Sequence, residues 1–101
     1  MKIIAGERKP EPDRAMIRAL RNGHRWADML NTGTALGDIA RAEGYATSYV
    51  RRIIPLATLS PRLQEAIITG TQPLRLTLET LVRSQLPICF EDQERRLGMR
   101  G

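Results

Sequence analysis

The stretch LGDIARAEGYATSYVRRII, residues 36–54, has the spacing of two short helices that cross steeply over a tight turn. Ala40 is small enough to sit where the helices cross, and Gly44 tolerates the positive φ with which the first helix would end. Three apolar side chains would face inward and hold the second helix at its angle: Ile39, Val50 and Ile53. The pattern therefore predicts a helix-turn-helix with helices over residues 36–43 and 47–54.

The open side of the second helix carries polar side chains: Thr47, Ser48, Tyr49, Arg51 and Arg52. Hydroxyls and guanidiniums are the groups that hydrogen-bond to base edges and phosphates in a major groove. We therefore expect base contacts from Thr47, which would also cap the helix, and from Ser48 and Arg51. Arg52 and Tyr49 would contact the DNA backbone. The alternative is an ordinary helical hairpin whose glycine only ends a helix and whose arginines form a solvated face.

Positive charge is concentrated around this helix. The 101 residues carry a formal net charge of +5, and of the 16 basic residues only Lys2 and Lys9 are lysines. Between residues 14 and 52 seven arginines oppose three carboxylates, a net of +4. Such an excess favours a polyanionic partner, because the planar guanidinium donates two parallel hydrogen bonds to phosphate or to guanine.

A longer amphipathic helix is expected before the helix-turn-helix, over residues 13–31, with Asp13 as its cap. Its apolar face comprises Met16, Ala19, Leu20, Ala27 and Leu30, with Trp26 at the border. Gly23 also lies on this face, where a close contact with another helix would explain a poor helix former. The opposite face is a stripe of arginines with no acid beside them: Arg14, Arg18, Arg21 and Arg25. We expect the stripe to contact the DNA backbone; the alternative is a solvated helix face.

Local signals predict more short helices after the helix-turn-helix and no sheet. Ser60 is an N-cap followed by proline at the first helical position, and Gly70 would end that helix. Thr77 would cap a second helix, which Pro87 would keep from continuing, and a last helix is expected over residues 90–97. We therefore expect an all-α domain of about five to six helices around a central helix-turn-helix.

The domain is expected to span residues 13–101, after a flexible lead-in over residues 1–12 and with a C-terminal helical segment over residues 60–98. From Thr71 onward the chain has more apolar side chains than the helix-turn-helix needs for its own packing. We expect this part to complete the core and to offer a face for a homodimer, because one small module reads few base pairs.

Several classes of function lack the residues that they need. Cys89 is the only cysteine and His24 the only histidine, so we expect neither an internal disulfide nor a structural zinc site. No paired carboxylates, nucleophile–base pair or phosphate-binding loop is evident, so we expect neither an enzyme nor a cofactor, and no small-molecule substrate. No segment resembles a membrane span or a signal peptide, and we expect a cytoplasmic, nucleoid-associated protein.

The order of elements resembles two families of DNA-binding proteins. TSYVRRIIPLATL, residues 47–59, followed at once by SPRLQEAIITG, residues 60–70, is similar to the helix-turn-helix domain of the ParB/KorB partition and repressor family. The likeness is closer to the C-terminal DNA-binding extension of some bacterial serine site-specific recombinases. In those proteins a segment like HRWxxxL precedes the helix-turn-helix, and the chain closes with LP and then QRRxLG. Here the corresponding segments are His24-Arg25-Trp26, Leu86-Pro87 and residues 94–98.

The resemblance covers residues 14–98 and implies sequence-specific binding of duplex DNA, with reading positions at Thr47, Ser48, Arg51 and Arg52. The recombinase catalytic domain and the nucleotide-binding box of partition proteins are not found, so neither chemistry carries over. We expect a transcriptional regulator or recombination accessory of a bacterial prophage or mobile element, either free-standing or part of a larger protein. The rival hypothesis is a helical protein–protein interaction adapter, on which the arginines would be rim charges.

Overall fold

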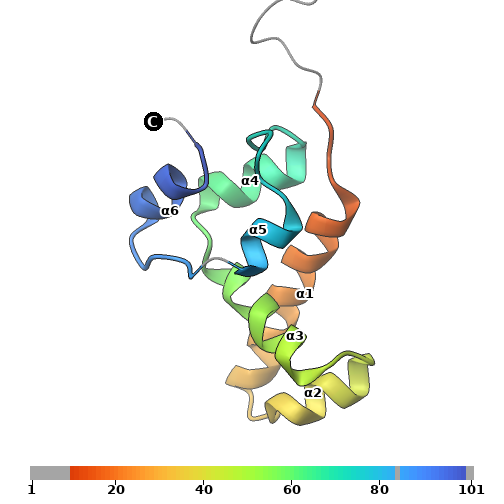
Figure 1. Ribbon diagram of the computed structural model, residues 1–101. Coiled ribbons are helices and arrows are strands. Elements are labelled where there is room, and N and C mark those ends of the chain that lie inside the picture. Colours follow the sequence, from red (N-terminus) through yellow and green to blue (C-terminus); the bar gives the residue numbers. More distant parts are fainter. Residues whose placement is uncertain (1–9, 84, 100–101) are drawn as a thin grey trace, which may run out of the picture.

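The computed structural model describes residues 10–83 and 85–99, which form six α-helices, one 3₁₀-helix and no β-strand (Figure 1). In chain order the elements are α1 (Arg14–Asn31), α2 (Leu36–Glu43), α3 (Thr47–Ile53), η1 (Ile54–Thr58), α4 (Pro61–Thr69), α5 (Leu78–Arg83) and α6 (Phe90–Arg96). The expected all-α fold is confirmed. Of the lead-in expected over residues 1–12, residues 1–9 lie outside the described part.

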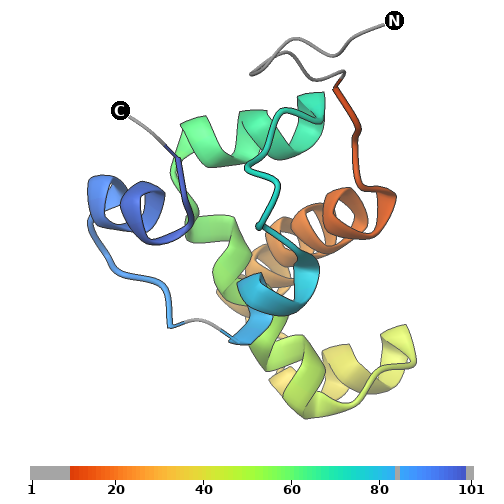
Figure 2. The ribbon, with the colours of Figure 1, turned by 45° about the horizontal axis from the view of Figure 1, so that its top comes forward.

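The longest helix, α1, connects two groups of elements. The α2–α3 pair packs beside its C-terminal half, whereas α4 lies toward its other end, as Figures 1 and 2 both show, with α6 on the far side of α4 from α1 in Figure 2. The short helix α5 packs against both α1 and α3. At the start of α1, the Glu11 N–H donates to the Gly70 carbonyl oxygen at the end of α4 (2.9 Å), so the end of the lead-in is packed against the domain.

The buried face of α1 is rotated slightly about the helix axis relative to the predicted face. Trp26 is completely buried in the core, although the periodicity placed it at the border, and Leu30 is 38% exposed although it was predicted inside. The rings of Tyr45 and Tyr49 cover Trp26, and both come from the part of the chain that forms the turn and α3. These tertiary contacts, which the period of a single helix does not contain, rotate the apolar face toward the helix-turn-helix.

Gly23 is the point of closest approach between α1 and the chain that follows α3. A Cβ on Gly23 would lie 2.8 Å from the Ile53 carbonyl oxygen and 3.3 Å from the Leu56 Cβ. Because the glycine has no side chain, η1 lies directly against the backbone of α1. The predicted close helix contact is therefore confirmed, and its partner is the junction of α3 and η1.

The helix-turn-helix forms as predicted, except at the two ends of its second helix. Gly44 ends α2 at φ 80° and donates its N–H to the Ala40 carbonyl oxygen (2.9 Å), while Val50 and Ile53 are completely buried. The prediction that Thr47 caps α3 is wrong. The turn after Gly44 is so short that Ala46 occupies the cap position, and Thr47 is already the first helical residue.

The helical path continues beyond residue 54, where the second helix was predicted to end, and Pro55 takes part in its next turn. The α-helix α3 ends at Ile53, and residues 54–58 continue as the 3₁₀-helix η1. Proline is tolerated in the first turn of a helix because the N–H that it lacks would have no partner there. The second helix is therefore extended toward α1 by a tighter turn.

One buried glutamine ties α6 to the rest of the domain. The Gln93 side chain is almost completely buried; its Oε1 accepts from the Ser60 N–H (2.7 Å), and its Nε2 donates to the carbonyl oxygens of Thr58 (3.0 Å) and Pro87 (2.8 Å). Ser60 in turn caps α4 through its hydroxyl, which accepts from the Leu63 N–H (3.1 Å). The predicted cap of α4 and the predicted last helix are thus confirmed, and one polar network holds them together.

The close crossing can be tested with two glycine substitutions. Gly23→Ala should lower the free energy of unfolding by about 1–3 kcal/mol, because the overlap with the Ile53 carbonyl oxygen outweighs the gain in helix propensity. Gly37→Ala in α2 is the matched control: its Cβ would meet nothing within 4 Å, so stability should rise by up to ~1 kcal/mol. Urea denaturation measures both, and a Gly23→Ala protein as stable as the wild type would contradict the crossing.

Candidate nucleic-acid interface

The outward side of α3 is polar and accessible. Ser48, Arg51 and Arg52 are exposed, and Thr47 is half-buried. Residues spaced by three and four positions share one face of a helix, so these exposed side chains point the same way, opposite Val50 and Ile53. Within the part of the chain that the structure describes, the side chains of Arg51 and Arg52 make no hydrogen bond or ion pair. Both guanidiniums are therefore available to an external anion.

Tyr49 differs from the other predicted contact residues because it is half-buried in an aromatic cluster. Its ring stacks on Tyr45, with centroids 4.9 Å apart, and both rings meet Trp26 edge-on at 6.4 and 5.5 Å. Sequence reasoning missed Tyr45, because it lies in the turn before α3, where helical spacing does not predict which side chains meet. The cluster holds the turn and α3 against α1, so it fixes the direction in which the exposed arginines point.

One arginine of α1 acts electrostatically on this cluster. Burial raises the pKa of the Tyr49 hydroxyl above its ordinary value of 10.0, Tyr45 adds to the rise, and the charge of Arg18 opposes it. Arg18 therefore lies close enough to act on the hydroxyl across the α1–α3 contact.

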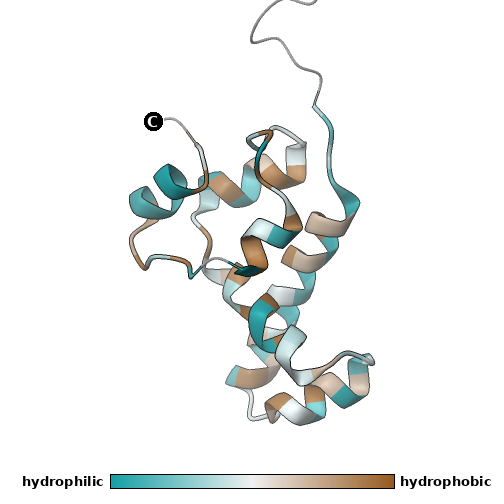
Figure 3. Ribbon diagram, in the orientation of Figure 1, coloured by the Kyte–Doolittle hydropathy of each residue, from teal (hydrophilic) through white to brown (hydrophobic). Residues whose placement is uncertain are grey.

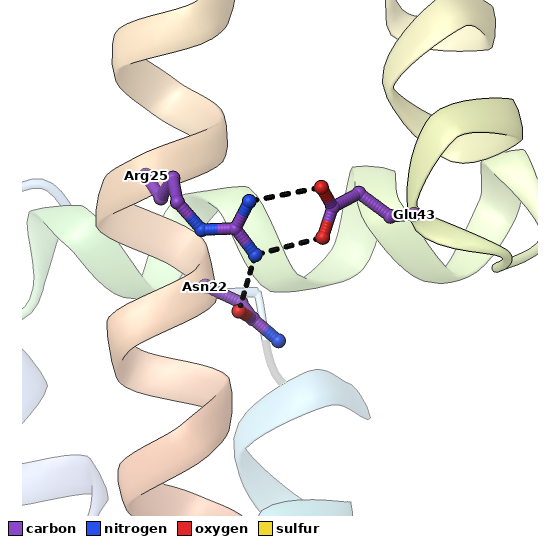
Figure 4. Close-up of polar contacts among 3 residues, drawn as sticks. All are labelled: Asn22, Arg25 and Glu43. Carbon is purple, nitrogen blue, oxygen red and sulfur yellow. Dashed lines mark hydrogen bonds and ion pairs between the residues drawn. The ribbon is translucent and has the colours of Figure 1, made fainter.

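Arg25, predicted as the last member of the arginine stripe, has a protein partner. Its Nη1 and Nη2 donate to the two carboxylate oxygens of Glu43 at the end of α2 (2.9 and 2.7 Å), and Nη2 also donates to Asn22 (3.0 Å) (Figure 4). This hydrogen bond is the main reason why the pKa of Glu43 is lowered below its ordinary value of 4.5. The Trp26 indole N–H adds to the lowering, although it makes no hydrogen bond of ordinary geometry. The statement that no acid accompanies the stripe is therefore wrong for Arg25, because α2 brings Glu43 from 18 residues away.

The other arginines of the stripe remain unpaired within the described residues: Arg14, Arg18 and Arg21 are exposed on α1 and make no ion pair. By contrast, the arginines of α2, α4 and α5 and one of the two on α6 are each paired with a carboxylate: Arg41–Asp38, Arg62–Glu94, Arg83–Glu79 and Arg95–Asp92. Of the described arginines without an ion pair, Arg75 and Arg96 lie elsewhere, and the other five are on α1 and α3. An anionic partner would relieve the repulsion that this arrangement leaves.

Other kinds of site find little support among the described residues. His24, through Nε2, shares a hydrogen bond with the Gln64 side chain (2.7 Å), and no group of three histidine, cysteine or acidic residues could hold a metal ion. None of the helices in residues 10–83 and 85–99 is both long enough and apolar enough to cross a membrane.

Comparisons with known proteins give no relative for the chain: no family model, no curated protein and no solved structure matches it. The exposed face of α3 and the arginines on α1 are therefore the features that point to a function.

The ion pair between α1 and α2 predicts a pH dependence of stability. Because folding lowers the pKa of Glu43, the carboxylate stabilises the fold above pH 4.5, and this contribution is lost as the pH falls through the lowered value. Glu43→Gln should therefore be less stable than the wild type at neutral pH, and the difference should shrink in acid. Urea denaturation across the pH range measures it. Arg25→Ala is the control: if the two groups act as a pair, the double variant loses less than the sum of the single losses.

Proposed function

We propose that the chain binds duplex DNA sequence-specifically, with α3 in the major groove. The observation that carries the proposal is the outward face of α3, on which Ser48, Arg51 and Arg52 are exposed on the second helix of a helix-turn-helix. A helix of seven residues is about 10 Å long, and the major groove is about 12 Å wide. A face of this size suits contacts to a few base pairs.

Base contacts are assigned to the middle and the start of this face. Arg51 is the best candidate for a direct contact, because a free guanidinium can donate two hydrogen bonds to the O6 and N7 atoms of guanine. Ser48, one turn earlier, can contact a base or the nearest phosphate through its hydroxyl. Thr47 is half-buried beside them and would contribute at the edge of the face.

Phosphate contacts are assigned to the charges that flank α3. Arg52 lies on the face itself, and Arg18, on the neighbouring helix α1, is close enough for its charge to act on Tyr49. Arg21 and Arg14 are exposed on the same helix and make no ion pair with the described residues. Arg25 is left out of the contact set, since it already donates to both oxygens of Glu43 and fixes the end of α2. A function as transcriptional regulator or recombination accessory in a bacterial prophage or mobile element would use this surface to choose a site.

The first test is Arg51→Ala, measured against a duplex selected from a random pool. The variant should bind about 1–3 kcal/mol more weakly, roughly 5- to 150-fold, and lose preference at one base pair, because a bidentate contact to a base is removed. Arg95→Ala is the control, since this guanidinium is also exposed but is paired with Asp92 on α6. Fluorescence anisotropy gives the affinities, and unchanged affinity and preference for Arg51→Ala would exclude the assignment.

The second test separates phosphate contacts from base contacts by their salt dependence. Replacing Arg18 with alanine should weaken binding to all sequences alike and reduce the slope of log K against log salt by about 0.9. Base preference should stay the same, because the lost group would touch only the backbone. Wild-type protein that binds no duplex at physiological salt would refute the proposal and leave the interaction adapter as the better hypothesis.

A further inference from the structure

An apolar groove lies on the side of the molecule that carries α6. Its volume is about 530 Å³, and it is formed by the link between η1 and α4 together with the segment that leads into α6. Most of the lining is apolar and includes Leu59, Pro61, Leu86, Pro87 and Phe90. Figure 3 shows this leading segment as partly hydrophobic beside the hydrophilic helix α6.

The most exposed large apolar side chain of the described residues stands at the rim of this groove. Ile88 is 98% exposed, and Phe90, two residues later, is 49% exposed. A single exposed apolar residue is ordinary, but a projecting isoleucine beside an apolar groove forms a continuous patch that water solvates poorly. The patch therefore contains both a projecting apolar group and a hollow able to accept one.

The relation between Ile88 and the groove is fixed by the fold. Gln93 donates to the Pro87 carbonyl oxygen next to Ile88, and the same amide group donates to Thr58 on the opposite wall. Its oxygen accepts from the Ser60 N–H, so the two walls are joined through one buried side chain. Because the projection and the hollow are held at a set distance, they can match a surface of fixed shape.

Charge distinguishes this face from the rest of the molecule. Residues 57–65 and 85–99, which form the groove and α6, carry three arginines and four carboxylates, a net of −1, against +4 over residues 14–52. Most of these charges are paired within the region, in Arg62–Glu94 and Arg95–Asp92. Two copies of a chain with a net charge of +5 therefore repel each other least when these faces meet.

We propose that this patch is the interface of a homodimer in which Ile88 of each copy enters the groove of the other. A two-fold interface uses the same surface on both subunits, so it needs a projection and a hollow in one patch, which Ile88 and the groove supply. A second copy also brings a near-neutral face, which suits an apolar groove. The interface leaves the exposed side of α3 uncovered, and it does not depend on DNA binding.

The test compares two exposed apolar residues in the absence of DNA and under reducing conditions. Sedimentation equilibrium of the wild type should give twice the mass of one chain at high micromolar concentration. Ile88→Asp should raise the dissociation constant by roughly 100-fold, because each dimer loses two buried isoleucines. Leu74→Asp is the matched control: Leu74 is 77% exposed and lies outside the groove, so this variant should dimerise like the wild type.

Cys89 provides an independent readout, because it is exposed and directly follows Ile88. Alkylation of this thiol should slow as the concentration of the wild type rises into the dimeric range, and should stay fast in Ile88→Asp. A wild type that remains monomeric would overturn the proposal and assign the groove to a partner of another kind. The proposal would also be overturned if both substitutions weakened the dimer equally or if Ile88→Asp still dimerised like the wild type. An alkylation rate that did not change with dimerisation would overturn it as well.

Discussion

The close crossing of α1 by the junction of α3 and η1, at Gly23, is the constraint on which the other features depend. The Ile53 carbonyl oxygen and Leu56 occupy the space where any other residue would carry a side chain. Since α3 runs directly into η1, this contact sets the angle of α3 against α1. The aromatic cluster around Trp26 then fixes the other end of α3. Together they hold a helix of only seven residues, which would not be stable alone.

The arrangement of ion pairs gives the domain an uneven surface. Carboxylates lie within reach of the arginines of α2, α4 and α5, and Glu43 reaches Arg25, but none accompanies Arg51 or Arg18 in the described part of the chain. Single exposed ion pairs contribute little to stability, so their absence on α3 costs the fold almost nothing. The lack of ion pairs on α3 instead makes the electrostatic potential at its exposed side more positive, and a more positive potential would attract a polyanion.

The fold could be predicted largely because its boundaries depend on local chemistry. Asp13 and Ser60 cap helices through their own side chains, and Gly44 and Gly70 end helices at positive φ. The exposure of Arg51 and Arg52 followed from the helical period once Val50 and Ile53 were placed inside. These inferences need only neighbours in sequence.

The remainder depends on the tertiary packing and on the conformation of the turn, and there prediction failed. The partner of Arg25 comes from the end of α2, the ring beside Tyr49 belongs to the turn, and Trp26 is central because both tyrosines cover it. Thr47 does not cap α3, because the short turn places Ala46 at the N-cap position. The length of the turn thus had more effect than the capping preference of the residue. Of the candidate site, the outward face of α3 was thus predictable, while the selection among the α1 arginines was not.

The two proposed surfaces are connected through the same rigid path, and this has a consequence for specificity. Gln93 fixes the groove to η1, and Gly23 fixes η1 and α3 to α1, so a dimer formed at the groove would hold two copies of α3 at a set distance and orientation. Binding of one copy would then present the second at a high effective concentration, but only to a half-site at the matching spacing. A module whose reading face spans few base pairs would gain selectivity from this geometry rather than from further contacts.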